Sequence, residues 1–206
     1  MAETALVHVI DDDPAVRDSV QFLLESAGVG ARTYASATEF LAEAPELRSG
    51  CVLTDVRMPD IDGLTLQRRL SELGLRLPVI VMTGHGDVPI AVQALKTGAA
   101  DFLEKPFEAD RLLRVVRDAL VASAAERTRA LNQDAIRQRL ESLTPREREV
   151  LDKLVEGLPN KTIAYDLGTS PRTVEVQRAR VMDKMAARSL PDLVRMVLAA
   201  GNPPRL

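Results

Sequence analysis

The stretch CVLTDVRMPD, residues 51–60, decides the fold class of this chain. Val52 and Leu53 have the character of a buried strand, and the residues from Met58 onward have the character of a turn. Asp55 therefore lies where a strand gives way to a loop, the edge of an open α/β sheet at which ligands bind. A single acid in that place is more often a turn residue than a working group, so its role depends on the other strand ends.

The length, cysteine count and charge of the chain limit the kinds of protein that it can be. The chain has 206 residues, enough for two domains, and its one cysteine excludes an intrachain disulfide and a multi-cysteine zinc site. It has no long uncharged apolar run and no signal-peptide start, so we expect a cytoplasmic protein without a membrane segment. Residues 1–120 carry 12 Lys and Arg against 19 Asp and Glu, whereas residues 121–206 carry 15 against 11. This asymmetry indicates different partners for the two halves, with nucleic acid a candidate for the second.

Apolar and helical patterns alternate through the first half of the chain. Five short apolar runs favour strands, at residues 6–10, 31–34, 51–54, 78–83 and 100–104. A helical pattern follows each of them, and Asp13 before Pro14 is typical of a helix start. The alternation predicts an α/β fold with a doubly wound, five-stranded parallel sheet that helices cover on both faces.

The rest of the chain is expected to be helical. Residues 123–140 contain no Gly or Pro and are rich in Ala, Arg and Gln, which favours a helical linker over the alternative of a solvated one. From Thr144 onward, cap and turn residues separate four short helices, with Asn160 capping the second and the third spanning residues 172–185. The expected parts are an α/β domain at 1–122, the linker at 123–140 and a small all-α helix-turn-helix domain at 141–206.

Acidic, hydroxyl and cationic residues follow the predicted strands. Asp11 and Asp12 end the first strand, Asp55 the third, Thr83 the fourth and Lys105 the fifth, so all should meet at one edge of the sheet. Crowded carboxylates repel one another, a penalty that Mg²⁺ removes because it binds a few carboxylates and several waters. A metal-neutralised Asp55 can then attack phosphorus, while Lys105 and Thr83 stabilise the phosphoryl oxygens.

These residues resemble the phosphoacceptor, or receiver, domain of two-component response regulators. The match consists of Asp11-Asp12, Asp55, Thr83 and Lys105-Pro106, and the resemblance covers about residues 5–120. It implies a flavodoxin-like sheet of strand order 2-1-3-4-5 and a phosphoryl group that passes from a sensor histidine kinase to Asp55. It also implies that the Lys105-Pro106 peptide bond is cis.

The same resemblance implies roles for further residues. The implied ligands of a Mg²⁺ cofactor are Asp11 (through water), Asp12, Asp55 and the main-chain carbonyl of Arg57. The implied switch pair is Thr83 and Phe102, and the implied dimer face contains Val92, Lys96 and Asp101. We also interpret His85, in a glycine-flanked loop after Thr83, as a residue that influences the lifetime of the phosphoryl group; a solvent-facing histidine is the alternative.

The predicted third helix of the basic half has two distinct faces. If Val174 points inward, Arg178 and Val181 lie near it. The residues of the opposite face are Arg172, Val176, Ala179, Arg180 and Asp183. A solvated surface could carry this mixture, but a recognition helix would use it to place arginines near phosphates and its N-terminal residues near base edges.

This half resembles the LuxR-type DNA-binding domain. The matching segments are REREVL (146–151), NKTIA (160–164) and SPRTV (170–174), and the resemblance runs from about residue 140 to the end. It implies base-facing positions at Glu175, Val176 and Ala179. It implies phosphate contacts at Lys161, Thr173, Arg180 and Lys184, with Arg172 on the same DNA-facing surface.

Together these features predict a response regulator that accepts a phosphoryl group, dimerises, and activates transcription at promoter DNA with RNA polymerase. It is not expected to be an enzyme beyond slow autodephosphorylation. Segments 83–89 and 101–108 resemble a subfamily that includes regulators of oxygen-controlled nitrogen fixation and of other pathways. Two alternatives stay open: a DNA-binding regulator that ignores phosphorylation, and a phosphohydrolase with an aspartyl-phosphate intermediate and Asp13 as general acid.

Overall fold

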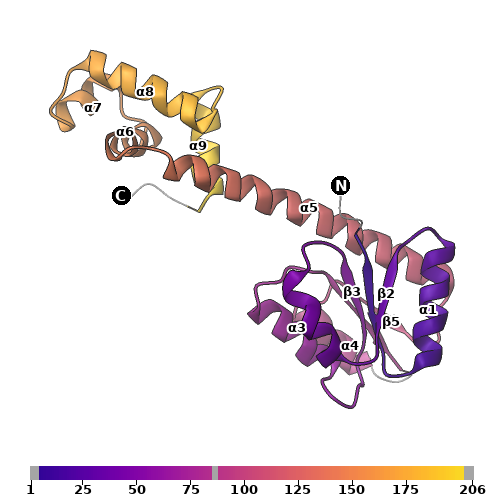
Figure 1. Ribbon diagram of the computed structural model, residues 1–206. Helices are drawn as coiled ribbons and strands as arrows, with labels where there is room; N and C mark the ends of the chain where they lie inside the picture. The colour runs from indigo at the N-terminus through magenta and orange to yellow at the C-terminus, as the bar shows by residue number, and fades with distance from the viewer. Residues whose placement is uncertain (1–4, 85–87, 202–206) are drawn as a thin grey trace. The chain divides into compact units, whose positions relative to one another are not determined.

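A five-stranded parallel sheet lies at the centre of the N-terminal unit (Figure 1). Its strands are β1 (Val7–Ile10), β2 (Ala31–Tyr34), β3 (Cys51–Asp55), β4 (Val79–Thr83) and β5 (Asp101–Glu104). They follow the order β2-β1-β3-β4-β5, and every neighbouring pair is parallel. The predicted fold class and strand order are therefore confirmed.

The computed structural model describes residues 5–84 and 88–201 and separates into two units, Met1–Thr128 and Arg129–Leu206. The helices of the first unit are α1 (Pro14–Ser26), α2 (Ala37–Glu43), the 3₁₀ helix η1 (Ala44–Glu46), α3 (Gly63–Glu72), α4 (Val88–Lys96) and the first part of α5 (Ala109–Glu141). Residues 123–140 lie within α5. Among the described residues, no helix combines the length and apolar character needed to cross a membrane.

Each face of the sheet has its own hydrophobic core, because successive strand residues point to opposite sides. On one side, Phe40 of α2 and Leu66 of α3 pack in the same core as Val52. On the other side, Leu24 of α1 and Val116 of α5 pack in the same core as Leu53. Each such buried side chain contributes about 1.5–3 kcal/mol, so the two layers of helices hold the strand ends in fixed register.

Local turn chemistry positions the loop that follows β3. The Asp62 carboxylate accepts a hydrogen bond from the amide of Thr65 at 2.7 Å, so α3 begins at Gly63. A Cβ atom at Gly63 would lie 2.5 Å from the carbonyl oxygen of Asp55, so only glycine fits. The close approach folds the loop back over the end of the strand that carries Asp55.

The second unit is helical and has its own core. It contains the end of α5, then α6 (Pro145–Val155), α7 (Asn160–Asp166), α8 (Pro171–Met185) and α9 (Leu190–Ala199). Its core residues include Leu151, Ile163, Val174, Val181 and Leu193, all fully buried. The turn between α7 and α8 places Gly168 at φ 59°, so the two helices form a helix-turn-helix.

The cap predicted for α7 is wrong. Asn160 is the first residue of the helix, and Pro159 holds the cap position without a side-chain hydrogen bond. The Asn160 side-chain oxygen instead accepts a hydrogen bond from Arg178 Nη1 of α8 at 3.4 Å. A tertiary contact thus takes the polar side chain that the local pattern assigned to the helix end.

Candidate functional site

Two buried carboxylates share one lysine at the C-terminal edge of the sheet. Lys105 Nζ donates to Asp11 Oδ2 at 2.6 Å and to Asp55 Oδ1 at 2.9 Å. The two acids are 1% and 9% exposed, respectively, whereas the Lys105 side chain that joins them is 25% exposed. One positive charge faces two negative ones, which leaves this edge of the sheet with a net negative charge.

Strand pairing and the turns beside it bring these groups together. The amide of Lys105 donates to the carbonyl of Thr83 at 2.7 Å, which extends the β4–β5 pairing as far as the site. The Lys105-Pro106 bond is cis. Asp11 Oδ1 accepts from the amide of Asp13 at 3.0 Å, and Asp55 Oδ2 accepts from the amide of Arg57 at 3.2 Å. The second oxygen of each carboxylate is thus held by the main chain.

Burial raises the pKa of Asp55, and the nearby Asp11 carboxylate acts in the same direction. The hydrogen bond and charge of Lys105 oppose this shift without cancelling it. Burial alone would lower the pKa of Lys105, but its hydrogen bonds to both carboxylates outweigh that effect and raise it. Asp55 is therefore a carboxylate in an unfavourable environment, a typical property of a group that is kept for its reactivity.

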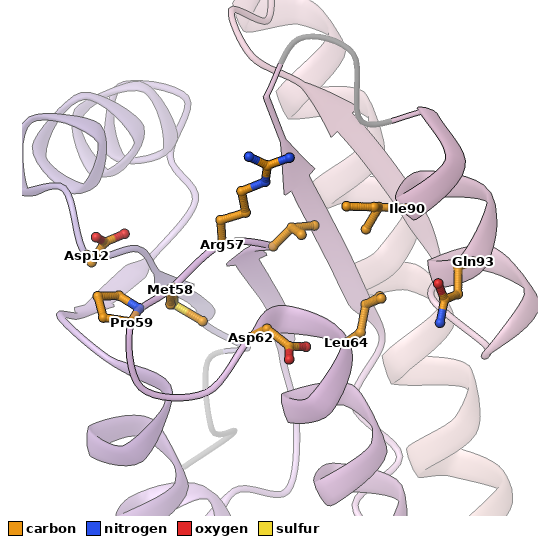
Figure 2. Close-up of a pocket in the computed structure, with 9 residues that line it drawn as sticks. Asp12, Arg57, Met58, Pro59, Asp62, Leu64, Ile90 and Gln93 are labelled. Atoms are coloured by element: carbon orange, nitrogen blue, oxygen red, sulfur yellow. The ribbon is translucent and has the colours of Figure 1, made fainter.

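Asp12 lies apart from this ion pair. It is exposed and lines a hollow of ≈ 580 Å³ together with Arg57, Met58 and other residues of the β3–α3 loop and α4 (Figure 2). Across residues 5–84 and 88–201, no three His, Cys, Asp or Glu side chains are arranged so that they could hold a metal ion. The structure thus brings Asp11 and Asp55 together through Lys105 but does not gather Asp12 with them.

Among the described residues, the possible metal-binding atoms at this edge are nevertheless all oxygen atoms. They are the carboxylates of Asp11, Asp12 and Asp55 and the main-chain carbonyls of the neighbouring loops. Hard oxygen donors suit Mg²⁺, which keeps several waters and needs only one or two carboxylates, rather than zinc or copper. The uncompensated negative charge beside Lys105 favours a cation as well, so the residues fit the predicted ion.

Asp13 has a structural role in the turn after β1. Its carboxylate caps α1 by accepting a hydrogen bond from the amide of Ala15 at 2.8 Å, as predicted. The phosphohydrolase interpretation requires this same carboxylate to act as a general acid, which would break the cap. The geometry therefore favours a phosphoacceptor over a phosphohydrolase.

The two residues of the predicted switch pair lie in neighbouring strands, Thr83 at the end of β4 and Phe102 in β5. Thr83 is 2% exposed, and its hydroxyl donates to the carbonyl of Gly84 at 3.0 Å rather than to Asp55. Phe102 is half-buried and lines a second hollow, of ≈ 370 Å³, with Phe107 and Arg111. His85 lies outside the described residues.

The predicted dimer face is an exposed surface of α4 and β5. Val92 and Lys96 are exposed, and the Asp101 carboxylate accepts a hydrogen bond from Arg111 at 3.2 Å. Leu95, which sequence reasoning missed, is 42% exposed beside Val92 at 44%. Two neighbouring aliphatic side chains on one helix make this face suitable for a contact with another protein.

Helix α8 presents the residues predicted to face DNA. Val174 and Val181 are fully buried, as the helical pattern predicted. The exposed residues are Lys161 on α7 and, on α8, Arg172, Thr173, Glu175, Val176, Ala179 and Arg180. Val176 is 46% exposed, so an aliphatic side chain is available for contact on this face of the helix.

Lys184, another predicted DNA contact, forms an ion pair within the domain. Its ammonium group donates to Glu147 Oε2 at 2.6 Å and to the carbonyl of Ser142 at 3.2 Å. The hydrogen bond from Lys184 is the main cause that lowers the pKa of Glu147, which also completes a capping box with Thr144. Only the capping-box spacing pointed to Glu147; its pairing with α8 was not visible in the sequence.

Comparisons with known proteins agree with both halves of this description. Residues 7–117 match the family model "Response regulator receiver domain", and residues 141–197 match "Bacterial regulatory proteins, luxR family". The transcriptional regulatory protein FixJ of Azorhizobium caulinodans is 55% identical over 99% of this chain and 97% of its own length.

Solved structures show the same likeness. The response regulator StyR has a TM-score of 0.84 at 41% identity, covering 95% of this chain and 99% of its own. Full-length FixJ from B. japonicum has a TM-score of 0.60 at 50% identity, covering 97% of this chain and 98% of its own. The identity extends over both units, so the likeness concerns the whole chain and not the sheet alone.

Proposed function

Because this chain belongs to the response regulators that join a receiver domain to a LuxR-type DNA-binding domain, we propose a function for each part. We propose that phosphorylation of Asp55 controls the binding of the protein to promoter DNA. As a member of that family it is a transcriptional regulator of a two-component system. The observation that carries the proposal is the pair of buried carboxylates, Asp11 and Asp55, joined by Lys105 at the edge of the sheet. We assign the receiver domain to residues 1–122, the linker to 123–140 and the DNA-binding domain to 141–206.

The chemistry is a phosphoryl transfer from a histidine of a sensor kinase. An oxygen of Asp55 forms the new bond to phosphorus while the bond between phosphorus and the kinase histidine breaks, and the histidine keeps the electron pair. Lys105, already 2.9 Å from Asp55, stays beside the new phosphoryl oxygens and balances their charge. The Thr83 hydroxyl turns from the carbonyl of Gly84 toward the same oxygens, and Phe102 turns with it.

Receiver domains generally bind Mg²⁺ at their phosphorylation site. In this chain the residues to hold it are Asp12, Asp55 and the main-chain carbonyl of Arg57, with Asp11 acting through water. When bound, the ion neutralises the carboxylates and the phosphoryl oxygens. Asp12 must then leave its position beside the hollow and turn toward Asp55. Slow loss of the phosphoryl group to water is the only hydrolytic activity that we assign.

The DNA-binding domain reads the promoter through α8. Glu175, Val176 and Ala179 face the base edges, while Thr173, Arg172 and Arg180, together with Lys161, contact phosphates. Lys184 contacts a phosphate as well, but this contact competes with its ion pair to Glu147. We place the protein in the cytoplasm, where it acts with RNA polymerase to activate transcription, with nitrogen-fixation promoters the first candidates to examine.

Footprinting on genomic DNA tests this function. Protein treated with acetyl phosphate and Mg²⁺ should protect a set of promoters at lower protein concentrations than untreated protein does. The matched control is Asp55→Asn carried through the same treatment, which should protect DNA like the untreated wild type. Equal protection by treated and untreated wild-type protein would establish the alternative, a DNA-binding regulator that ignores phosphorylation.

Substitutions on α8 should separate phosphate contacts from base contacts. Arg180→Ala should weaken binding about equally on all DNA sequences and reduce the salt dependence, with a slope smaller by about 1, because one phosphate contact is lost. Val176→Ala should change which sequence is preferred while it leaves the salt slope alone. Fluorescence anisotropy on specific and random duplexes at several salt concentrations measures both effects. A Val176 variant with unchanged selectivity would contradict this placement of α8.

A further inference from the structure

Arg17 of α1 is bound to the main chain of the acidic turn. Its Nη1 atom donates to the carbonyl oxygen of Asp11 at 2.7 Å and to that of Asp12 at 3.1 Å. Hydrogen bonds from a charged guanidinium are stronger than those between neutral groups, and the planar group holds a fixed direction. One side chain therefore fixes two consecutive peptide groups at the end of β1.

The two acids depend on Arg17 to different degrees. The Asp11 carboxylate has its own partners, the amide of Asp13 at 3.0 Å and Lys105 at 2.6 Å. Within the described part of the chain, the exposed Asp12 side chain has no hydrogen bond or ion pair, so only its main chain is held, through Arg17. Without Arg17, the main chain at Asp12 would be free to rotate, and the direction of its carboxylate would no longer be fixed.

We propose that Arg17 is a positioning residue, which holds the turn so that the Asp12 carboxylate can reach the Mg²⁺ bound beside Asp55. The proposal rests on the proposed function, since it assumes that the ion binds there. The charge of Arg17 and its geometry act in opposite directions on a cation. As a positive charge near carboxylates it repels Mg²⁺, whereas as a clamp on the turn it favours Mg²⁺ by reducing the freedom of a ligand.

Because the charge of Arg17 and its hold on the turn change the affinity for Mg²⁺ in opposite directions, the sign of the change in Kd distinguishes between them. Isothermal titration with MgCl₂ on the full chain should give a Kd about 10-fold higher for Arg17→Ala than for the wild type, the usual loss when a residue behind a ligand is removed. Arg17→Lys keeps the charge and a donor but loses the planar group, so its Kd should lie between the two. The matched control is Arg68→Ala, which removes the same charge from α3; among the described residues, Arg68 pairs only with the exposed Glu72. It should leave the Kd unchanged.

An Arg17→Ala protein that binds Mg²⁺ as tightly as the wild type, or more tightly, would overturn the proposal, because only the charge would then matter. Thermal unfolding guards against a folding defect; if Arg17→Ala is unfolded, the comparison uses Arg17→Lys and Arg17→Gln. A second readout is the initial rate of labelling by acetyl phosphate, which should return to the wild-type value at saturating Mg²⁺. Failure of the wild type itself to bind Mg²⁺ would instead count against the proposed function.

Discussion

Asp55→Asn is expected to abolish phosphoryl uptake, so that the treated variant has the same mass as the untreated one. The amide cannot attack phosphorus as a carboxylate does. Among the described residues, Asp11 is the other buried acid bonded to Lys105, but it is 1% exposed against 9% for Asp55, so Asp55 is the more accessible of the two to a phosphodonor. Incubation with acetyl phosphate and Mg²⁺, followed by mass spectrometry of the intact protein, measures the uptake. Asp60→Asn is the matched control, because Asp60 is an exposed acid of the same loop that binds Thr38, and it should label normally.

The same variant should be more stable than the wild type, so that lost labelling is not lost folding. The pKa of Asp55 is raised in the folded protein, mainly by burial. A carboxyl group with a raised pKa contributes stability below its unfolded pKa and loses that contribution as the pH rises through the folded pKa, so at neutral pH the ionised group is unfavourable. An uncharged amide avoids this penalty, and calorimetry at pH 7 should show a higher unfolding midpoint. A hydroxylamine-sensitive phosphoryl adduct that persists in Asp55→Asn would show that another acid is the acceptor.

Phosphorylation is expected to convert the protein from monomer to dimer through the face that contains Val92 and Leu95. The phosphoryl group adds about −1.5 to −2 charges beside Lys105, which draws Thr83 toward the new oxygens and remodels the face formed by α4 and β5. To change a regulator from mostly inactive to mostly active, phosphorylation must shift the free-energy difference between the two states by about 5 kcal/mol. A new interface can supply part of this free energy in addition to the local charge change. A two-fold dimer would then place two α8 helices on half-sites about 34 Å apart.

Analytical ultracentrifugation with and without the phosphoryl mimic beryllofluoride measures this change. Val92→Asp should keep the mimic-bound protein monomeric and weaken its binding to a two-half-site duplex. Leu73→Asp is the control, because Leu73 is an exposed aliphatic residue just after α3, at 54% against 44% for Val92. If the mimic-bound protein stays monomeric at high concentration and still binds DNA more tightly, the switch acts by freeing the DNA-binding domain instead.

Local patterns in the sequence were sufficient for the fold and for part of the site. The alternation of apolar runs and helical periods determined the five-stranded parallel sheet, and Asp13 caps α1 as the Asp13-Pro14 pair predicts. The position of Asp55 at a strand end follows from the same periodicity. These features depend on neighbours within a few residues, which is the range over which side-chain spacing and capping act.

Contacts between distant segments were decided only by the tertiary structure. Lys105 and Asp11 are 94 residues apart, and their hydrogen bond exists because parallel pairing carries the ends of β1 and β5 to one edge. The pair of Lys184 with Glu147 is of the same kind. The choice of Asp11 and Asp55, and not Asp12, as the partners of Lys105 was also decided by the tertiary structure. The sequence alone determined which residues reach the edge of the sheet. Which of them touch depended on strand register, on rotamers and on competition among partners for each charge, and these are properties of the packed chain.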